Sequence, residues 1–201
     1  MAYWINRQNL TSTLGALALA GLVTVSLSGC VGLVVGAGAT AGVAALEERT
    51  AATIASDTTI ATKIRLNLIE ANEKLLTGVA VEVYQARVLM TGALPTEALR
   101  AEAIRIAWKV KDVKDVLNEI QVTDLGIADV ARDTWITTQL TSALTFDRDV
   151  RAINYNIETV NGTIYLIGLA QNQKELDHVI ARARQISGVL RVINHVQVKK
   201  G

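Results

Sequence analysis

Few residues of this chain have the types and the spacing that catalysis requires. Cys30 is the only cysteine, so no internal disulfide can form, and His178 and His195 fall on a predicted helix and on the outward face of a predicted strand. Glu82 and Glu158 occupy outward strand positions without a second acid at a recognised catalytic spacing. The sequence contains no metal-ligand cluster, phosphate loop or dinucleotide fingerprint. We therefore predict no catalytic site, no metal and no cofactor.

The chemistry of Cys30 depends on the segment that precedes it. A single positive charge, Arg7, is followed over residues 14–27 by an apolar run too short for a comfortable membrane span. This pattern predicts a secretory signal peptide over residues 1–29. The run Leu27-Ser28-Gly29-Cys30 resembles the lipobox of bacterial lipoproteins. The alternative is an ordinary signal peptide followed by an unrelated cysteine.

The lipobox resemblance implies that Cys30 becomes the first residue of the mature chain and carries a diacylglyceryl group and an amide-linked acyl chain such as palmitate. Two or three acyl chains hold a protein permanently on its membrane. In such lipoproteins an aspartate after the cysteine favours the inner membrane, whereas this chain has Val31. The resemblance therefore implies anchoring in the outer membrane, facing the periplasm.

Residues 30–56 contain the lipidated cysteine and a segment rich in glycine and alanine, without charge until Glu47. Two interpretations stay open for this segment. It could lie in the lipid interface beside the acyl chains, or it could be a flexible tether, because it is dense in glycine and lacks helical amphipathicity.

The rest of the chain is an internal duplication. A shift of 76 residues aligns residues 57–122 with residues 133–198 without a gap, and about 14 of the 66 pairs are identical. The identities sit mainly at apolar positions, at expected caps and at one glycine, Gly92 or Gly168. They indicate a shared backbone and core, in two domains joined by a linker over residues 123–132.

Each copy has the same predicted order of elements. Asp57 and Asp133 are expected to cap a first helix whose apolar stripe faces the core. Two alternating stretches predict a hairpin, for which Asn161-Gly162 is a strong turn signal. A second helix follows over about residues 96–110 and 173–186, and an alternating strand ends each copy. The stripes comprise Ile60, Ile64, Leu68, Ile136, Leu140 and Leu144.

The predicted fold class is therefore α+β, with two tandem αββαβ domains that each pack two helices on a three-stranded mixed sheet. This order, the strand-ending glycines and the closing pattern V-x-x-V-x-N-x-(I/V)-x-V resemble the BON domain (bacterial OsmY and nodulation). Two such domains behind a lipobox resemble the dual BON-domain outer-membrane lipoproteins. The resemblance implies binding of anionic phospholipid, support of outer-membrane integrity and no catalysis. The net charge of +1 also argues against a broad nucleic-acid surface.

The candidate lipid site lies on the first helix of the second copy. Trp135 is about 100° away from the core stripe, and an indole there suits the headgroup level of a bilayer. The alternative is that Trp135 packs on the neighbouring domain or over its own core edge. The expected phospholipid-binding residues are Trp135, Leu140, Thr138, Gln139 and Arg132. Two further cationic candidates are Arg148 and Arg151, although nearby aspartates weaken their case.

A second class of function remains open. The chain could be a protein-interaction scaffold, or a chaperone-like factor, that acts on the machinery assembling outer-membrane barrels. Lipid binding predicts that the second domain finds anionic vesicles without the acyl anchor, whereas a scaffold predicts a crosslinked protein partner and no vesicle response.

Overall fold

The computed structural model describes residues 47–124 and 126–200, so the predicted signal peptide, Cys30 and most of the predicted tether lie outside the described residues. The described residues belong to one compact unit, Ala37–Gly201. Because the hydrophobic cores described below lie within this unit, we expect it to fold without residues 1–36.

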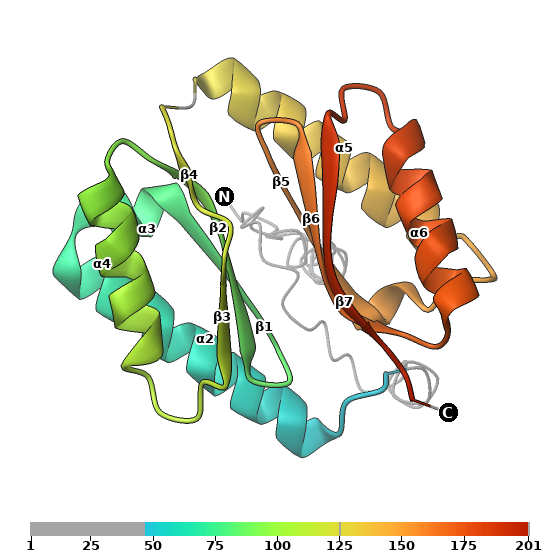
Figure 1. Cartoon of the computed structure of the whole chain (residues 1–201), viewed down its shortest axis with the longest axis horizontal. Helices are drawn as coiled ribbons and strands as arrows, with labels where there is room; N and C mark the ends of the chain where they lie inside the picture. Colours follow the sequence, from blue (N-terminus) through green and yellow to red (C-terminus); the bar gives the residue numbers. More distant parts are fainter. Residues whose placement is uncertain (1–46, 125, 201) are drawn as a thin grey trace, which may run out of the picture. The chain divides into compact units, whose positions relative to one another are not determined.

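Each copy forms one α+β domain (Figure 1). The first domain contains α2 (Ala51–Ala71), α3 (Glu73–Gly78), β1 (Val79–Tyr84), β2 (Arg87–Leu94), α4 (Glu97–Trp108), β3 (Asp115–Asn118) and β4 (Gln121–Val122). The second domain contains α5 (Ile127–Thr145), the short 3-10 helix η1 (Ala152–Asn154), β5 (Tyr155–Val160), β6 (Thr163–Ala170), α6 (Gln173–Gln185) and β7 (Arg191–Val198).

The two sheets have the same topology and register. In each domain a tight hairpin pairs the first two strands in antiparallel fashion, and the last strand lies parallel to the second. Arg87 pairs with Asp115 in the first domain, and the equivalent Thr163 pairs with Arg191 in the second. The last strand is continuous in the second domain but is split into β3 and β4 in the first. The predicted three-stranded mixed sheet under two main helices is confirmed.

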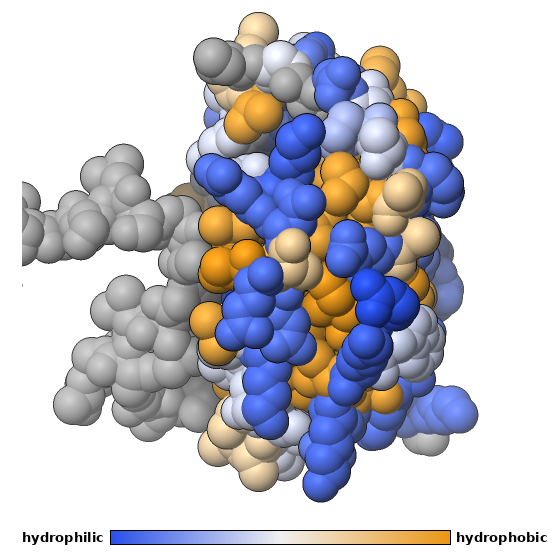
Figure 2. All heavy atoms as spheres, turned by 90° about the vertical axis from the view of Figure 1, so that its left-hand side faces the viewer, coloured by the Kyte–Doolittle hydropathy of each residue, from blue (hydrophilic) through white to orange (hydrophobic). Residues whose placement is uncertain are grey.

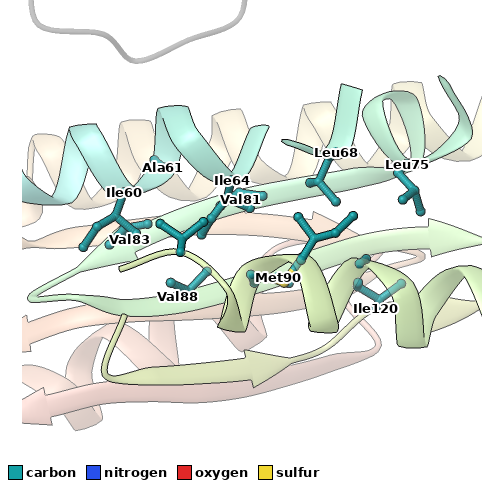
Figure 3. Packing of buried hydrophobic residues seen from close by; sticks show 14 of the residues in the cluster. Ile60, Ala61, Ile64, Leu68, Leu75, Val81, Val83, Val88, Met90 and Ile120 are labelled. Atoms are coloured by element: carbon teal, nitrogen blue, oxygen red, sulfur yellow. The ribbon is translucent and has the colours of Figure 1, made fainter. Parts of the chain in front are cut away.

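The helices bury the predicted stripes against one face of each sheet. Ile64 is fully buried in the first core (Figure 3), and Leu140 occupies the equivalent place in the second. Their neighbours at helical spacing, Leu68 and Leu144, are also buried, because residues three and four apart share a helix face. Each domain thus has a hydrophobic core of its own.

The first helices begin earlier than the sequence predicted. Thr50 caps α2 through its hydroxyl, which accepts the Thr53 N–H at 3.1 Å, and Gly126 precedes α5. Asp57 and Asp133 therefore lie inside these helices, and the expectation that they are caps was wrong. Because α5 begins at Ile127, part of the segment expected to be a linker is helical.

Gly92 and Gly168 permit a close approach of two backbones. They lie within β2 and β6 with φ of +116° and +153°. A Cβ at either position would overlap a carbonyl oxygen at the start of the partner strand, that of Gly78 or Asn154. The shared glycine therefore serves the hairpin, where any side chain would force the strands apart.

The faces of the two sheets that are turned away from the helices pack on each other. A third apolar cluster joins the domains, and it contains Tyr84, Leu89, Val160, Tyr165 and Ile167. Strand positions expected to face outward are therefore covered by the other copy. This corrects the assignment of Glu82 and Glu158 as outward residues, because both lie partly buried between the sheets.

Candidate functional site

A buried aspartate fastens the first helix of each domain to its hairpin turn. The carboxylate of Asp57 accepts the N–H groups of Gln85 and Ala86 at 2.9 and 2.8 Å. Asp133 accepts those of Asn161 and Gly162 in the same way. All four turn residues have positive φ, so the aspartate stabilises a turn that is strained at its non-glycine positions.

The Asp133 contact sets the orientation of α5. With one side held on the hairpin and the stripe in the core, the opposite side of the helix faces solvent. Trp135 is 48% exposed there, and Thr138 and Gln139 are also exposed. Leu140 is fully buried in the core of the second domain, so its assignment to the contact edge was wrong. It follows Ile136 by four residues and therefore shares the core-facing stripe.

A second exposed aromatic residue lies beyond Trp135 on the same helix. Phe146, at the C-cap of α5, is 84% exposed. Trp135 and Phe146 are separated by just over three full turns, so they lie about 20° apart around the helix axis. The structure thus adds to the candidate surface an aromatic residue that the sequence analysis missed.

The C-terminal end of α5 is fixed on α6, which holds Phe146 in place. The carboxylate of Asp147 hydrogen-bonds to His178 Nε2 at 2.8 Å and pairs with Arg182 at 3.1 Å. The hydrogen bond from His178 is the main cause that lowers the pKa of Asp147. His178 is therefore a structural partner rather than a freely solvated residue.

The first copy has different side chains at the equivalent surface positions. Thr59 takes the place of Trp135, and its hydroxyl donates to the Ala55 carbonyl at 2.8 Å. Glu70, which is exposed, takes the place of Phe146. The backbone is shared, but only the second copy presents aromatic rings on the outer side of its first helix.

The three candidate arginines lie in different environments. Arg132 lies beside the aromatic surface on α5, where it pairs with Asp129 at 3.2 Å and donates to Asn161 Oδ1 at 3.4 Å. Arg148 is exposed after the end of the helix. Arg151 instead binds the carboxylate of Glu48 at 2.8 Å, near the start of the first domain.

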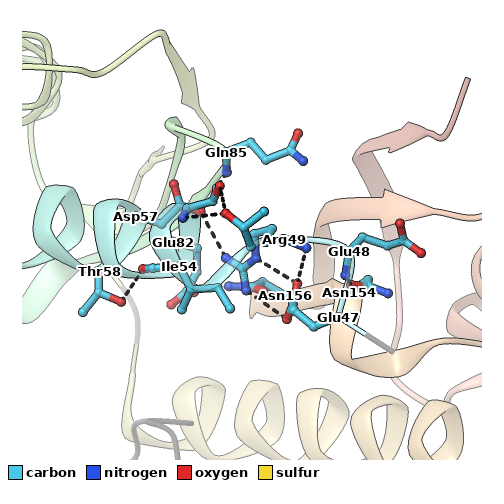
Figure 4. A network of polar contacts seen from close by, with 12 residues as sticks. Glu47, Glu48, Arg49, Ile54, Asp57, Thr58, Glu82, Gln85, Asn154 and Asn156 are labelled. Carbon is cyan, nitrogen blue, oxygen red and sulfur yellow. Dashed lines mark hydrogen bonds and ion pairs between the residues drawn. The ribbon is translucent and has the colours of Figure 1, made fainter. Parts of the chain in front are cut away.

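Residues 47–50, which we call the strap, touch both domains (Figure 4). Glu48 pairs with Arg151 and with Lys199, each at 2.8 Å, in the second domain. The hydrogen bond from Lys199 is the largest cause that lowers the pKa of Glu48. Arg49 binds Asp57 at 3.1 Å in the first domain, and its guanidinium lies 4.4 Å from the centre of the Tyr84 ring.

Polar contacts between the sheets accompany the third apolar cluster. Gln121 donates to the Val160 carbonyl and to the Tyr165 hydroxyl, each at 3.2 Å. His195 Nε2 lies 2.8 Å from a carboxylate oxygen of Glu119, which is its equivalent in the other copy. The two copies therefore meet through matching positions, in the manner of a two-fold interface.

Glu82 and Glu158 are a second matching pair at this interface. Glu82 accepts a hydrogen bond from Asn156 and forms an ion pair with Arg65 at 3.5 Å. Burial raises the pKa of Glu158 to about 7, and the negative charge of Glu82 contributes in the same direction. Because both carboxyl groups lie at this interface, loss of the Glu158 proton would place two negative charges between the sheets.

The described part of the chain contains no group of three or more residues placed to hold a metal ion. None of its helices combines the length and the apolar character needed to cross a bilayer.

The fold, and the contact of a buried helix aspartate with the hairpin turn in each copy, which we call the clasp, define a tandem αββαβ protein. The BON domain family matches residues 56–124 and 132–200. The chain belongs to the BON-domain family.

Similar proteins share most of this architecture. The Outer membrane lipoprotein DolP of Haemophilus influenzae is 32% identical over 185 residues, which covers 90% of this chain and 95% of that protein. A protein of Anaplasma centrale, described by its place in the gshII 5' region, is 37% identical over 139 residues, 66% of this chain and 92% of that protein. The 21 kDa hemolysin of Actinobacillus pleuropneumoniae is 30% identical and covers 76% of this chain and 73% of that protein.

Proposed function

We propose that this BON-domain protein is anchored in the outer membrane through Cys30, faces the periplasm and binds anionic phospholipid through its second domain. In this way it supports outer-membrane integrity without catalysing a reaction. The lipobox-like run supports the anchor, and the relationship to an outer membrane lipoprotein supports the location. Mass spectrometry should find acylated Cys30 at the mature N-terminus, and an unmodified N-terminus elsewhere would contradict the anchor.

The exposed aromatic pair on α5 carries the lipid-binding proposal. Trp135 and Phe146 present apolar rings on one side of a helix whose other side is fixed in the core. Exposed aromatic residues of this kind favour the interfacial region of a bilayer, because the ring enters the acyl boundary while the indole N–H stays among the headgroups.

The neighbouring polar residues complete the site. Thr138 and Gln139 lie exposed beside Trp135. The Gln139 amide can hydrogen-bond to lipid headgroups, and the Thr138 hydroxyl, which donates to the Thr134 carbonyl at 2.8 Å, can accept a hydrogen bond from them. Arg132 supplies a cation that remains partly exposed although it pairs with Asp129. Near an anionic surface each such cation contributes about 1 kcal/mol. The attraction of Arg132 to anionic lipid and the insertion of the Trp135 ring therefore occur on the same side of α5.

Substitution of Trp135 tests this site in the compact unit 37–201, which lacks the acyl anchor. Trp135→Glu should reduce binding to phosphatidylglycerol-containing vesicles by at least about tenfold, because a carboxylate replaces an inserted ring. Thr59→Glu is the matched control at the equivalent position of the first copy and should leave binding unchanged. If Trp135→Glu binds like the parent with an unchanged melting temperature, the lipid site is wrong and the scaffold function gains support.

One observation favours the scaffold as a second candidate. Apolar residues lie among charged side chains on the helical side of the first domain (Figure 2), and the exposed large ones on its helices are Leu66, Ile69, Leu76 and Trp108. Apolar surface that is exposed and bordered by charged side chains is typical of protein contacts. A photocrosslinker at Leu66 should then capture a component of the barrel assembly machinery in the envelope.

A further inference from the structure

The loop between α6 and β7 presents an exposed leucine on a fixed backbone. This loop, residues 186–190, which we call the Leu190 loop, lies beside the turn between β5 and β6. The Leu190 N–H donates to the Gly162 carbonyl at 2.8 Å, and the Val189 N–H donates to the Ile186 carbonyl at 3.2 Å. Leu190 is nevertheless 78% exposed. Because the backbone is already ordered, moving the Leu190 side chain from water into an apolar environment costs little conformational entropy of the backbone.

Two arginines flank Leu190. Arg184, in the last turn of α6, and Arg191, at the start of β7, line the same shallow hollow as Leu190. Both are exposed, and neither forms an ion pair with another residue in the described part of the chain. Arg182, by contrast, is paired with Asp147. The two cations beside Leu190 are therefore available to an anion from outside the domain.

The equivalent loop of the first domain has the same backbone but lacks this combination. Lys114 takes the place of Leu190, and its N–H donates to the Ala86 carbonyl at 2.9 Å, as the Leu190 N–H does to Gly162. Asp115 takes the place of Arg191 and pairs with Arg87 at 3.7 Å. The fold does not require an exposed leucine between two arginines, so this feature is a specialisation of the second copy.

The Leu190 loop adjoins the helix proposed to contact lipid. Gly188 lies against Ile136 and the aliphatic part of Arg132, since a Cβ at this glycine would be 3.4 Å from Ile136 and 4.0 Å from Arg132. Arg132 also reaches Asn161 in the neighbouring turn. The loop, the turn and the Arg132–Trp135 segment thus form a continuous end of the second domain.

We infer that the Leu190 loop is a second contact with the anionic membrane, in which Leu190 enters the acyl boundary and Arg184 and Arg191 bind lipid phosphates. This inference rests on the proposed lipid-binding function and extends it to an element outside α5. An apolar side chain between two unpaired cations matches a surface that has negative charge above hydrocarbon. Contacts from two different elements would also fix the orientation of the domain on the membrane, which a single helix does not.

The test uses the compact unit 37–201 and vesicles of phosphatidylcholine with or without phosphatidylglycerol. Arg184→Gln together with Arg191→Gln should weaken binding to the phosphatidylglycerol vesicles by about 25-fold, at about fivefold for each cation. Leu190→Ser should weaken it by about tenfold, because an inserted leucine is lost. Lys114→Gln, in the equivalent loop of the first copy, is the control and should bind like the parent.

The outcomes separate this inference from the proposed function. If Trp135→Glu abolishes binding while the Leu190-loop variants bind like the parent, lipid binding stands and the second contact is wrong. If Lys114→Gln weakens binding as much as one arginine substitution, the effect is that of total charge and the inference is overturned. If the parent binds neither vesicle, both the function and the inference fail. Unchanged melting temperatures show that the exposed substitutions leave the fold intact.

Discussion

At the scale of single residues, the duplicated aspartates have a clear structural role. Asp57 and Asp133 are buried inside helices, where each carboxylate accepts two backbone N–H groups of a hairpin turn. A hydrogen bond to a charged group stabilises a fold by about 1.5–3 kcal/mol, and burial increases the cost of its loss. The identity of these residues between the copies therefore reflects the clasp between helix and turn rather than shared chemistry.

Asp133→Asn should lower the free energy of unfolding by about 2 kcal/mol, because an amide keeps only one acceptor oxygen and turns its NH₂ toward a backbone N–H. Urea denaturation of the compact unit measures this loss. Asp149→Asn, an exposed aspartate of the same domain, should change stability by less than about 0.5 kcal/mol. Equal effects of the two substitutions would show that the clasp contributes nothing.

Glu158 should make the docking of the two domains depend on pH. Its pKa is raised from 4.5 to about 7 by burial and by Glu82, while Arg65 and a backbone hydrogen bond at Thr159 oppose the shift. Since the docked state holds the proton more tightly, docking is most stable below about pH 4.5 and weakens as the pH rises through about 7.

Glu158→Gln should remove most of this dependence and make the protein more stable than the parent above about pH 7. Thermal unfolding over a pH series provides the measurement, with Glu70→Gln near the end of α2, where the side chain is exposed, as the control. A parent whose stability rises across this range of pH would refute the assignment.

At the scale of elements, α5 has two faces with separate roles. Leu140 belongs to the core, and Trp135 belongs to the exposed surface. Leu140→Ala should lower the stability of the second domain by about 2–5 kcal/mol, because it leaves a cavity, whereas the folded fraction should bind vesicles as before. Chemical denaturation and vesicle sedimentation of the same sample check both parts. Weaker binding by fully folded Leu140→Ala would return Leu140 to the lipid site.

The local pattern was enough to predict most elements but not the contacts between them. The stripes at Ile60 and Ile136 and the turn at Asn161-Gly162 predicted helices and hairpins that the structure contains. An aspartate near a helix start is typical of a cap, and nothing local distinguishes this from a clasp on a turn far along the chain. The available signal for this contact was that Asp57 and Asp133 precede their hairpin turns by the same number of residues.

The packing of the two sheets also had a signal in the sequence. Strands β2 and β6 contain nearly continuous apolar runs, which are typical of strands covered on both faces. The alternation of apolar and polar residues in the neighbouring strands instead predicts that one face of each sheet is exposed to solvent. For the candidate site, Trp135 was predicted from its position off the stripe, whereas Phe146 lies at the end of the helix, where angular reasoning is weakest.

At the scale of the whole molecule, each copy has its own core but shares the surface of its sheet. The shared cluster includes Tyr165 and Ile167 from the second copy. Expressed alone, residues 126–200 should fold, because their core is complete, and should self-associate at high concentration through the uncovered sheet.

Circular dichroism and analytical ultracentrifugation test these two expectations. Tyr165→Lys should keep the isolated domain monomeric, because it places a charge in the centre of the uncovered face. An unfolded second copy would instead mean that the two domains require each other's contacts to fold.

The membrane contact itself can be observed through tryptophan fluorescence. Trp108 and Trp135 are the only tryptophans in the compact unit 37–201, and both are about half exposed. Trp108→Phe leaves Trp135 as the single reporter in the second domain, and Trp135→Phe leaves Trp108 as the matched reporter in the first. Vesicles that contain phosphatidylglycerol brominated on its acyl chains quench only an indole that reaches the hydrocarbon boundary. We predict strong quenching of Trp135 and none of Trp108. Bound protein with an unquenched Trp135, or equal quenching of both residues, would contradict it.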